Sequence, residues 1–216
     1  KKNIYLLFLT IIVVVVFAGS TNFDFVNIDD KTLIYENPLV TDSSIPYSQC
    51  FQQFLYSVYY KPLVFLSWKA EYELFGSSAS HFHVINWLLH LCNTILLFFI
   101  GMRLFRRLYP DERTVVFSSF LLALLFSINP LRLESVAWAT EPKDVLFSFL
   151  FLPSWLLYIK YIQTSRYLLV VIGGLLYFFS GLSKSMGLPL LGILFLTDYW
   201  FKRDFKLKLI TEKLPY

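Results

Sequence analysis

Long apolar blocks dominate the hydrophobic pattern of this chain, and short polar or charged segments separate them. Six blocks can be read, at Ile4–Gly19, Val84–Met102, Val115–Ile128, Val145–Tyr161, Tyr167–Leu182 and Met186–Trp200. At a rise of about 1.5 Å per residue, most of these blocks form helices ~24–28 Å long, which suits a bilayer core of about 30 Å once flanking aromatic residues are counted. The pattern predicts an all-α, polytopic transmembrane bundle of about six spans, formed as a single domain over residues 1–216.

The composition excludes a soluble protein. Of the 216 residues, 56% are hydrophobic and only 16% are charged, whereas soluble domains contain about 25% charged residues. Cys50 lies in a polar loop and Cys92 inside an apolar block, so we expect no disulfide between them. The net charge is only +4, and the basic residues sit beside the apolar blocks. They indicate membrane topology and not a nucleic-acid partner.

The distribution of lysine and arginine predicts the orientation of the spans. Basic clusters at 1–2, 103–113, 160–166 and 202–208 fall at alternate ends of successive blocks. All of them can therefore be cytoplasmic, with the first block as a permanent anchor. The non-cytoplasmic face then carries a long loop at 20–82, a shorter loop at 129–143 and a tight turn at 183–185. Every candidate for chemistry lies on that face.

The long outer loop contains two predicted helices. Tyr47, Phe51, Phe54, Leu55 and Val58 recur at helical spacing, which predicts a helix lying in the membrane interface. A second helix is expected to begin with Pro62 and to end at Gly76. An amphipathic piece of a soluble subdomain fits the same pattern equally well.

Two adjacent acids follow the first block at Asp29 and Asp30. One carboxylate could accept a proton from an attacking hydroxyl, or the pair could hold a divalent cation. Solvated loop charges are the commonest explanation for an arbitrary pair of this kind.

The second outer loop and the 183–185 turn supply candidate partners for a phosphate. Arg132, Lys143 and Lys184 are cations near the membrane surface, and Glu134 could orient them or contact a sugar hydroxyl. The alternatives are ordinary interfacial charges in the loop and a snorkelling lysine at 184.

A polar stripe runs along the second block. His83, Asn86, His90 and Asn93 are spaced by three or four residues, so they share one helical face. That face should look into the bundle or a wet cavity, where the histidines could position a substrate. Hydrogen bonding between helices is the alternative. His81 and His83 lack further ligands at suitable spacing, so no metal site is predicted.

Several of these motifs resemble a known family, the transmembrane/tetratricopeptide-repeat O-mannosyltransferase-like proteins. The motifs are FVNIDD at 25–30, ENP at 36–38, KPLVFLS at 61–67, LFG at 74–76, HVIN at 83–86 with His90 and Asn93, ESVAW at 134–138, KDVL at 143–146, LSK at 182–184 and DYW at 198–200. They cover nearly the whole chain in the family's order. The chain differs from the family pattern at Asn129, Arg132 and Pro142.

The resemblance implies a C-type glycosyltransferase scaffold related to protein O-mannosyltransferases. It implies that Asp29 acts as catalytic base with Asp30 in support, and that a polyprenyl- or dolichyl-phosphate sugar is the donor. No metal or other cofactor is expected. The family's repeats and later spans are not in this sequence, so we expect it to be a fragment.

These observations predict an inverting membrane glycosyltransferase that moves a sugar, mannose by resemblance, to a Ser/Thr hydroxyl of an acceptor protein. We expect a multi-pass integral membrane protein, in the bacterial inner membrane by preference and in the endoplasmic reticulum as the alternative. The departures in the second loop leave a non-catalytic scaffold or an inactive paralogue as the other interpretation. A transporter should show paired repeats or broken helices, which the sequence lacks.

Overall fold

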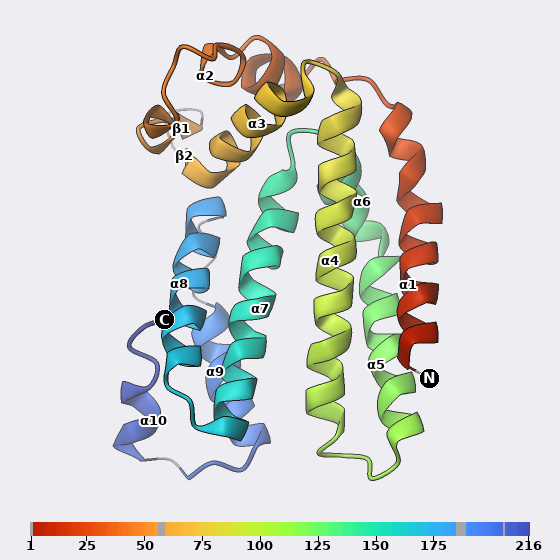
Figure 1. Ribbon diagram of the computed structural model, residues 1–216, viewed down its shortest axis with the longest axis vertical. Helices are drawn as coiled ribbons and strands as arrows, with labels where there is room; N and C mark the ends of the chain where they lie inside the picture. Colours follow the sequence, from red (N-terminus) through yellow and green to blue (C-terminus); the bar gives the residue numbers. More distant parts are fainter. Residues whose placement is uncertain (1, 56–58, 185–188, 205) are drawn as a thin grey trace.

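The computed structural model describes residues 2–55, 59–184, 189–204 and 206–216, and these are almost entirely helical (Figure 1). The α-helices are α1 (Lys2–Phe17), α2 (Pro38–Thr41), α3 (Pro62–Phe75), α4 (Ala79–Phe105), α5 (Glu112–Ser127), α6 (Leu133–Ala137), α7 (Pro142–Thr164), α8 (Leu168–Ser183), α9 (Pro189–Trp200) and α10 (Leu207–Thr211). Short 3₁₀ turns occupy Ala18–Asn22, Tyr47–Phe51 and Pro130–Arg132, and one π-helical turn occupies Lys31–Tyr35. The described strands are β1 (Phe54–Leu55) and β2 (Tyr59–Tyr60).

Helices α1, α4, α5, α7, α8 and α9 alternate in direction along the bundle, and α9 begins about halfway along it (Figure 1). Each corresponds to one predicted apolar block, although residues 186–188 of the last block lie outside the described part of the chain. The all-α prediction is confirmed, and the bundle has the composition of a membrane protein.

Among the described residues, three helical segments are long and apolar enough to cross a membrane: Lys2–Asn22, Ala79–Phe105 and Pro142–Thr164. A fourth span exists if α5 and the bent segment Pro130–Ala137, which turn by 54°, are counted together. Helix α8 is apolar but shorter. The arrangement with six spans therefore stays a prediction.

The outer helix α3 has the ends that its sequence predicts. Pro62 occupies its first position, where the missing N–H costs nothing. Gly76 follows its last turn at φ 87°, a conformation that glycine adopts without the penalty of a side chain. Both predicted boundaries are confirmed.

The interfacial helix predicted from Tyr47 onward is wrong. The structure forms a 3₁₀ turn at Tyr47–Phe51, and then β1 pairs antiparallel with β2, Phe54 opposite Tyr60. Tertiary contacts override the local periodicity: Cys50 is fully buried beside α3 and the Tyr47 hydroxyl bonds to Glu73. Val58, also assigned to that helix, lies outside the described residues.

Residues 18–78, which we call the outer subdomain, form a packed core of their own. Its buried members are Leu33, Ile34, Leu39, Val40, Cys50, Val64, Phe65 and Trp68, joined by Phe82 of α4 and Ala139 of the second outer loop. Lys69 is fully buried, donates to the carbonyl of Asp42 at 2.8 Å and pairs with Glu73 at 3.0 Å. The outer loop is thus a folded subdomain anchored on the bundle.

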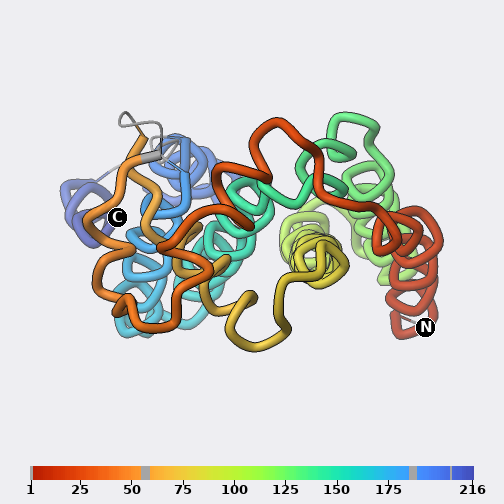
Figure 2. Tube along the Cα trace, turned by 90° about the horizontal axis from the view of Figure 1, so that it is seen from above, coloured from red at the N-terminus to blue at the C-terminus, as the bar shows by residue number. Residues whose placement is uncertain are grey.

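The outer subdomain covers one end of the helices. Seen from above, its chain runs from α1 across α7 to α8 (Figure 2). Helix α3 contacts both α7 and α8, which themselves pack along most of their length. The beginning of α7 and the end of α8 therefore come together beneath the outer subdomain, where several of the predicted site residues lie.

Candidate functional site

Asp30 joins the two outer loops. Its carboxylate is fully buried and accepts a hydrogen bond from the backbone N–H of Val26 at 2.7 Å. The other carboxylate oxygen accepts the indole N–H of Trp138, in the second outer loop, at 3.0 Å. Two fixed donors thus hold Asp30 in one orientation, which suits a supporting carboxylate.

Asp29 begins the same helical turn but is only half-buried. Its backbone carbonyl accepts a hydrogen bond from the Thr32 hydroxyl at 3.3 Å. The two acids therefore differ in environment: Asp30 is enclosed and held, whereas Asp29 is accessible from outside.

Lys143 and Lys184 lie at the junction of α7 and α8, each beside a carboxylate. Lys143 pairs with Glu141 just before α7, and Lys184 at the end of α8 pairs with Asp144 in the first turn of α7. The Ser135 hydroxyl donates to the second oxygen of Asp144 at 3.1 Å. Burial raises the pKa of the Glu141 carboxyl, and its pair with Lys143 opposes that change. Lys184, which was predicted in the separate 183–185 turn, thus lies against the residues that follow the second outer loop.

Lys61 completes this group, although no chemical role was predicted for it. It immediately precedes α3, is 8% exposed and lies over the ring of Tyr59 at 5.0 Å. Burial lowers the pKa of its ammonium, and the nearby charges of Lys143 and Lys184 act in the same direction. We call Lys61, Lys143 and Lys184, with Glu141 and Asp144, the lysine cluster. Its three cations and two carboxylates leave one net positive charge.

The polar stripe of α4 is buried and holds the neighbouring segments. Asn86 donates to the carbonyl of Trp138 at 2.8 Å, and Asn93 donates to the carbonyl of Val145 at 2.9 Å. The predicted orientation toward the bundle is therefore confirmed. The two asparagines thus hold the chain before and after the segment that carries Glu141, Lys143 and Asp144 of the lysine cluster.

His90 makes the contacts expected of a residue that joins helices. Its Nε2 lies 3.0 Å from the carbonyl of Ser127 on α5, and its ring contacts those of Phe17 and Phe126. These contacts account for His90 by packing between α1, α4 and α5. Its predicted role in positioning substrate stays a prediction.

His83 has a different environment. It is 2% exposed, and its ring lies edge-on to Phe23 with a centroid distance of 6.2 Å. Neither ring nitrogen has a hydrogen-bond partner within the described part of the chain. The Asp30 carboxylate interacts electrostatically with the imidazole of His83. His83 is therefore a buried imidazole beside the clamped carboxylate.

Arg132 and Glu134 lie near the beginning of the second outer loop. The guanidinium of Arg132 lies over the ring of Phe126, near the end of α5, at 4.8 Å from the ring centroid. Arg132 also interacts electrostatically with the imidazole of His90. Glu134 is exposed, and its negative charge contributes to raising the pKa of the Glu141 carboxyl. Arg132 thus lies on the α5 side of the loop, whereas Lys143 lies in the first turn of α7 beside Glu141.

The arrangement offers an accessible carboxylate next to a clamped one, and a group of cations at the same end of the helices. A carboxylate of this kind can accept a proton, and fixed ammonium groups can stabilise a phosphate. Among the described residues, no set of three or more His, Cys, Asp or Glu side chains is arranged to hold a metal ion.

Fold and site together define an all-α membrane protein with carboxylates and cations gathered at one end of its helices. The chain is similar to protein O-mannosyl-transferase F38B6.6 of Caenorhabditis elegans, with 25% identity over 209 residues that are 92% of this chain and 28% of the relative. It is also similar to protein O-mannosyl-transferase TMTC1 of Homo sapiens, with 33% identity over 102 residues, 46% of this chain and 10% of the relative. Protein O-mannosyl-transferase TMTC4 of Homo sapiens is 34% identical over 117 residues, 50% of this chain and 15% of the relative. These relatives confirm the predicted resemblance to an O-mannosyltransferase-like family.

The chain spans between about a tenth and just over a quarter of the length of these relatives. No family model matches it. No solved structure matches it.

Proposed function

We propose that the chain forms the catalytic end of a membrane glycosyltransferase that moves a sugar, mannose by analogy with the relatives' names, from a polyprenyl- or dolichyl-phosphate donor to a Ser/Thr hydroxyl of an acceptor protein. The observation that carries the proposal is the hydrogen bond from Trp138 to Asp30, which fixes the acidic pair against the second outer loop. The names of the relatives, protein O-mannosyl-transferases, support the same chemistry.

Asp29 is the proposed base. As the acceptor's hydroxyl oxygen attacks the anomeric carbon, its proton passes to the Asp29 carboxylate and the bond from that carbon to the donor phosphate breaks. The attack from the opposite side inverts the anomeric centre. The half-exposed position of Asp29 supports this role, because an acceptor chain must reach the base, and buried Asp30 then holds the turn in place.

The leaving group is the lipid phosphate, which is a weak base and needs positive charge more than a proton. Lys61, Lys143 and Lys184 supply that charge in this proposal, with Arg132 at the far side of the loop. Glu141 and Asp144 keep the cluster close to neutral while the site is empty. A phosphate that enters can take over part of their role, so the proposal needs no metal ion.

Exposed apolar side chains support a donor with a lipid tail. Phe23 and Ile28 of the first outer loop are 54% and 66% exposed, and Leu131 and Leu133 of the second are 84% and 58% exposed. The Asp30–Trp138 hydrogen bond joins these two loops. Apolar groups around a charged site suit a substrate whose tail stays in the bilayer while its head reaches the carboxylates. We propose that this face is the non-cytoplasmic one.

The test is sugar transfer in membranes that contain the full-length protein, supplied with polyprenyl-phosphate mannose and a Ser/Thr-containing acceptor peptide. Asp29→Asn should reduce the transfer rate by roughly a hundredfold or more, because the amide cannot accept the proton. Asp24→Asn is the matched control: it removes an exposed carboxylate from the same loop and should leave transfer unchanged.

Equal transfer by Asp29→Asn and the unsubstituted protein would remove Asp29 from the base role. No transfer by the unsubstituted protein, from polyprenyl-phosphate mannose or from dolichyl-phosphate mannose, would overturn the enzymatic proposal and favour a scaffold. Transfer that is lost on chelation and restored by Mn²⁺ or Mg²⁺ would reassign Asp29 and Asp30 as metal ligands.

A further inference from the structure

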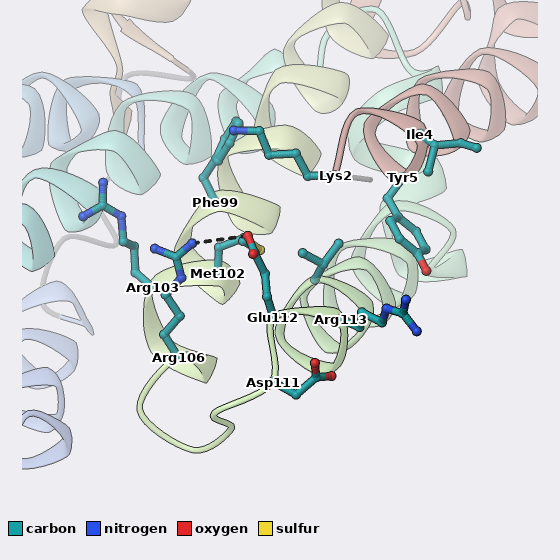
Figure 3. Close-up of a pocket in the computed structure, with 11 residues that line it drawn as sticks. Lys2, Ile4, Tyr5, Phe99, Met102, Arg103, Arg106, Asp111, Glu112 and Arg113 are labelled. Carbon is teal, nitrogen blue, oxygen red and sulfur yellow. Dashed lines mark ion pairs between the residues drawn. The ribbon is translucent and has the colours of Figure 1, made fainter.

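A cavity of about 1000 Å³ lies at the end of the bundle opposite the candidate site. It forms where the beginning of α1, the end of α4 and the beginning of α5 meet (Figure 3). His83 and Arg103 lie near opposite ends of α4, and the 20 residues between them correspond to roughly 30 Å of helix. The cavity is therefore separate from the proposed donor site.

Positive charge predominates around this cavity. Its walls carry Lys2, Arg103, Arg106 and Arg113 against Asp111 and Glu112, so four cations face two carboxylates. The long side chain of Lys2 extends from α1 toward Phe99 of α4 in Figure 3. A hollow with this excess of cations favours an anion.

Neither carboxylate fully neutralises the cations. The Asp111 carboxylate caps α5, accepting the backbone N–H and the hydroxyl of Thr114, each at 2.9 Å. Glu112 lies 3.8 Å from Arg106, in a loose and largely exposed pair. Arg103 donates to the neutral side-chain oxygen of Gln163. Among the described residues, neither Arg113 nor Lys2 forms a close ion pair, although the charge of Arg113 contributes to lowering the pKa of the Asp111 carboxyl.

The rest of the cavity wall is apolar. Tyr5, Phe99, Met102 and Val116 line it between the charged side chains. Ile4 of α1 also lines the cavity, and Leu7 and Phe8 follow it along α1; all three side chains are about half exposed. Inorganic phosphate would gain nothing from this surface, whereas a phosphate that carries acyl chains would bury apolar area along it.

We propose that this cavity binds the headgroup phosphate of an anionic phospholipid from the leaflet opposite the candidate site. Lys2, Arg106 and Arg113 contact the phosphate, and an acyl chain lies along α1. Clustered basic residues at the membrane end of a helix bundle attract such headgroups, each adding to the affinity. This inference does not depend on the proposed transferase activity.

The experiment measures phospholipid retained by the detergent-purified protein, using native mass spectrometry after incubation with phosphatidylglycerol or phosphatidylcholine. The unsubstituted protein should retain phosphatidylglycerol in preference. The double variant Arg106→Gln/Arg113→Gln should bind it roughly tenfold more weakly or worse. Both arginines are exposed, so the fold should survive, and an unchanged thermal midpoint checks this.

The matched control is Arg166→Gln/Lys208→Gln, which removes two exposed cations, one from the loop between α7 and α8 and one from α10, outside the cavity. It should retain phosphatidylglycerol to within about twofold of the unsubstituted protein. An equal loss in both double variants would overturn a defined site in favour of diffuse attraction. Displacement of the phospholipid by an equal concentration of inorganic phosphate would overturn a lipid site in favour of a free anion.

Discussion

Trp138 connects three parts of the site at once. Its indole N–H donates to Asp30, and its backbone carbonyl accepts from Asn86 of α4. A buried carboxylate that loses one of its donors is left with an unsatisfied oxygen, which costs more than an exposed hydrogen bond would. The orientation of the acidic pair therefore depends on one aromatic side chain of the second outer loop.

Trp138→Phe should lower the free energy of unfolding by roughly 1–3 kcal/mol and also reduce sugar transfer. Phenylalanine keeps an aromatic ring in the space but cannot donate to Asp30. The matched control is Trp155→Phe in α7, which removes a comparable donor, bonded at 2.9 Å to the Thr197 hydroxyl away from the acids. Both variants should be less stable, but only Trp138→Phe should lose transfer at matched protein levels. Equal transfer by the two would show that the Trp138 hydrogen bond serves stability alone.

Glu71 of α3 makes the stability of the outer subdomain dependent on pH. Its side chain is 6% exposed, and burial raises the pKa of its carboxyl to about 8, with a hydrogen bond from the Ser67 hydroxyl opposing the shift. In the unfolded chain this carboxyl titrates near pH 4.5. Between these values the folded protein holds a proton that the unfolded chain releases, so stability falls as pH rises.

The expected slope is up to roughly 1.4 kcal/mol of lost unfolding free energy per pH unit between about pH 5 and 8. It can be followed as the thermal midpoint of the purified protein at successive pH values. Glu71→Gln carries no proton to lose and should flatten the profile. Glu36→Gln, which changes an exposed glutamate paired with Lys31 at 3.4 Å, should keep the slope of the unsubstituted protein. A slope that persists in Glu71→Gln would exclude this carboxyl as its source.

The packing of α8 against the end of the chain depends on a glycine at one place. A methyl group on Gly174 would lie 2.3 Å from the backbone oxygen of Pro215, which cannot move without displacing the segment. That segment brings the ring of Tyr216 against Tyr158 and Tyr177. By contrast, a methyl group on Gly181, later in the same helix, would meet nothing within 4 Å among the described residues.

Gly174→Ala should therefore lower the unfolding free energy by roughly 1–3 kcal/mol, through forced displacement of Pro215. Gly181→Ala in the same helix should leave stability unchanged or raise it by about 0.5–1 kcal/mol, because alanine favours helix over glycine. Thermal midpoints of the two variants, compared with the unsubstituted protein, measure the difference. If both alanines raised the midpoint, the close approach at Gly174 would not be a constraint.

At the scale of elements, periodicity predicted the helices and the buried face of α4. Asn86 and Asn93 had to face inward, because lipid offers no hydrogen-bond partner to an amide. The same periodicity failed at Tyr47–Phe51, because burial of Cys50 decides that conformation and depends on α3, which comes later in the chain. Helical spacing alone does not contain that contact.

The candidate site was only partly predictable for the same reason. Asp30 could be identified as one of two acids, but its burial depends on a donor from Trp138, far along the sequence. Lys61 appeared as the residue before a helix, and its chemical role depends on Lys143 and Lys184 from two other helices. Residue types thus named the candidate groups, and the fold determines which of these side chains meet.

The whole molecule has two chemically different ends. The loops after α4, α7 and α9 lie together at one end, and these carry half of the predicted cytoplasmic arginines and lysines (Figure 1). The outer subdomain and the second outer loop lie at the other end. The alternating direction of the helices is what six crossings require, although α8 and the described part of α9 are shorter than an ordinary span. The termini of α8 are therefore the critical positions for the topology.

Single cysteines, introduced after both native cysteines are replaced by serine, should report this topology through labelling of intact cells with a membrane-impermeant maleimide. Asp24→Cys and Leu131→Cys, which change exposed residues of the two outer loops, should label from outside. Lys184→Cys should also label from outside, because Lys184 ends α8 beside the first turn of α7 and is partly exposed. Tyr109→Cys and Arg166→Cys should label only after the membrane is permeabilised. Leu131 tests the bent α5 segment and Lys184 tests α8. If Lys184→Cys labelled only after permeabilisation, together with Arg166→Cys, α8 would not cross, Lys184 would lie on the wrong side of the membrane for the proposed donor site, and the lysine cluster could not act there.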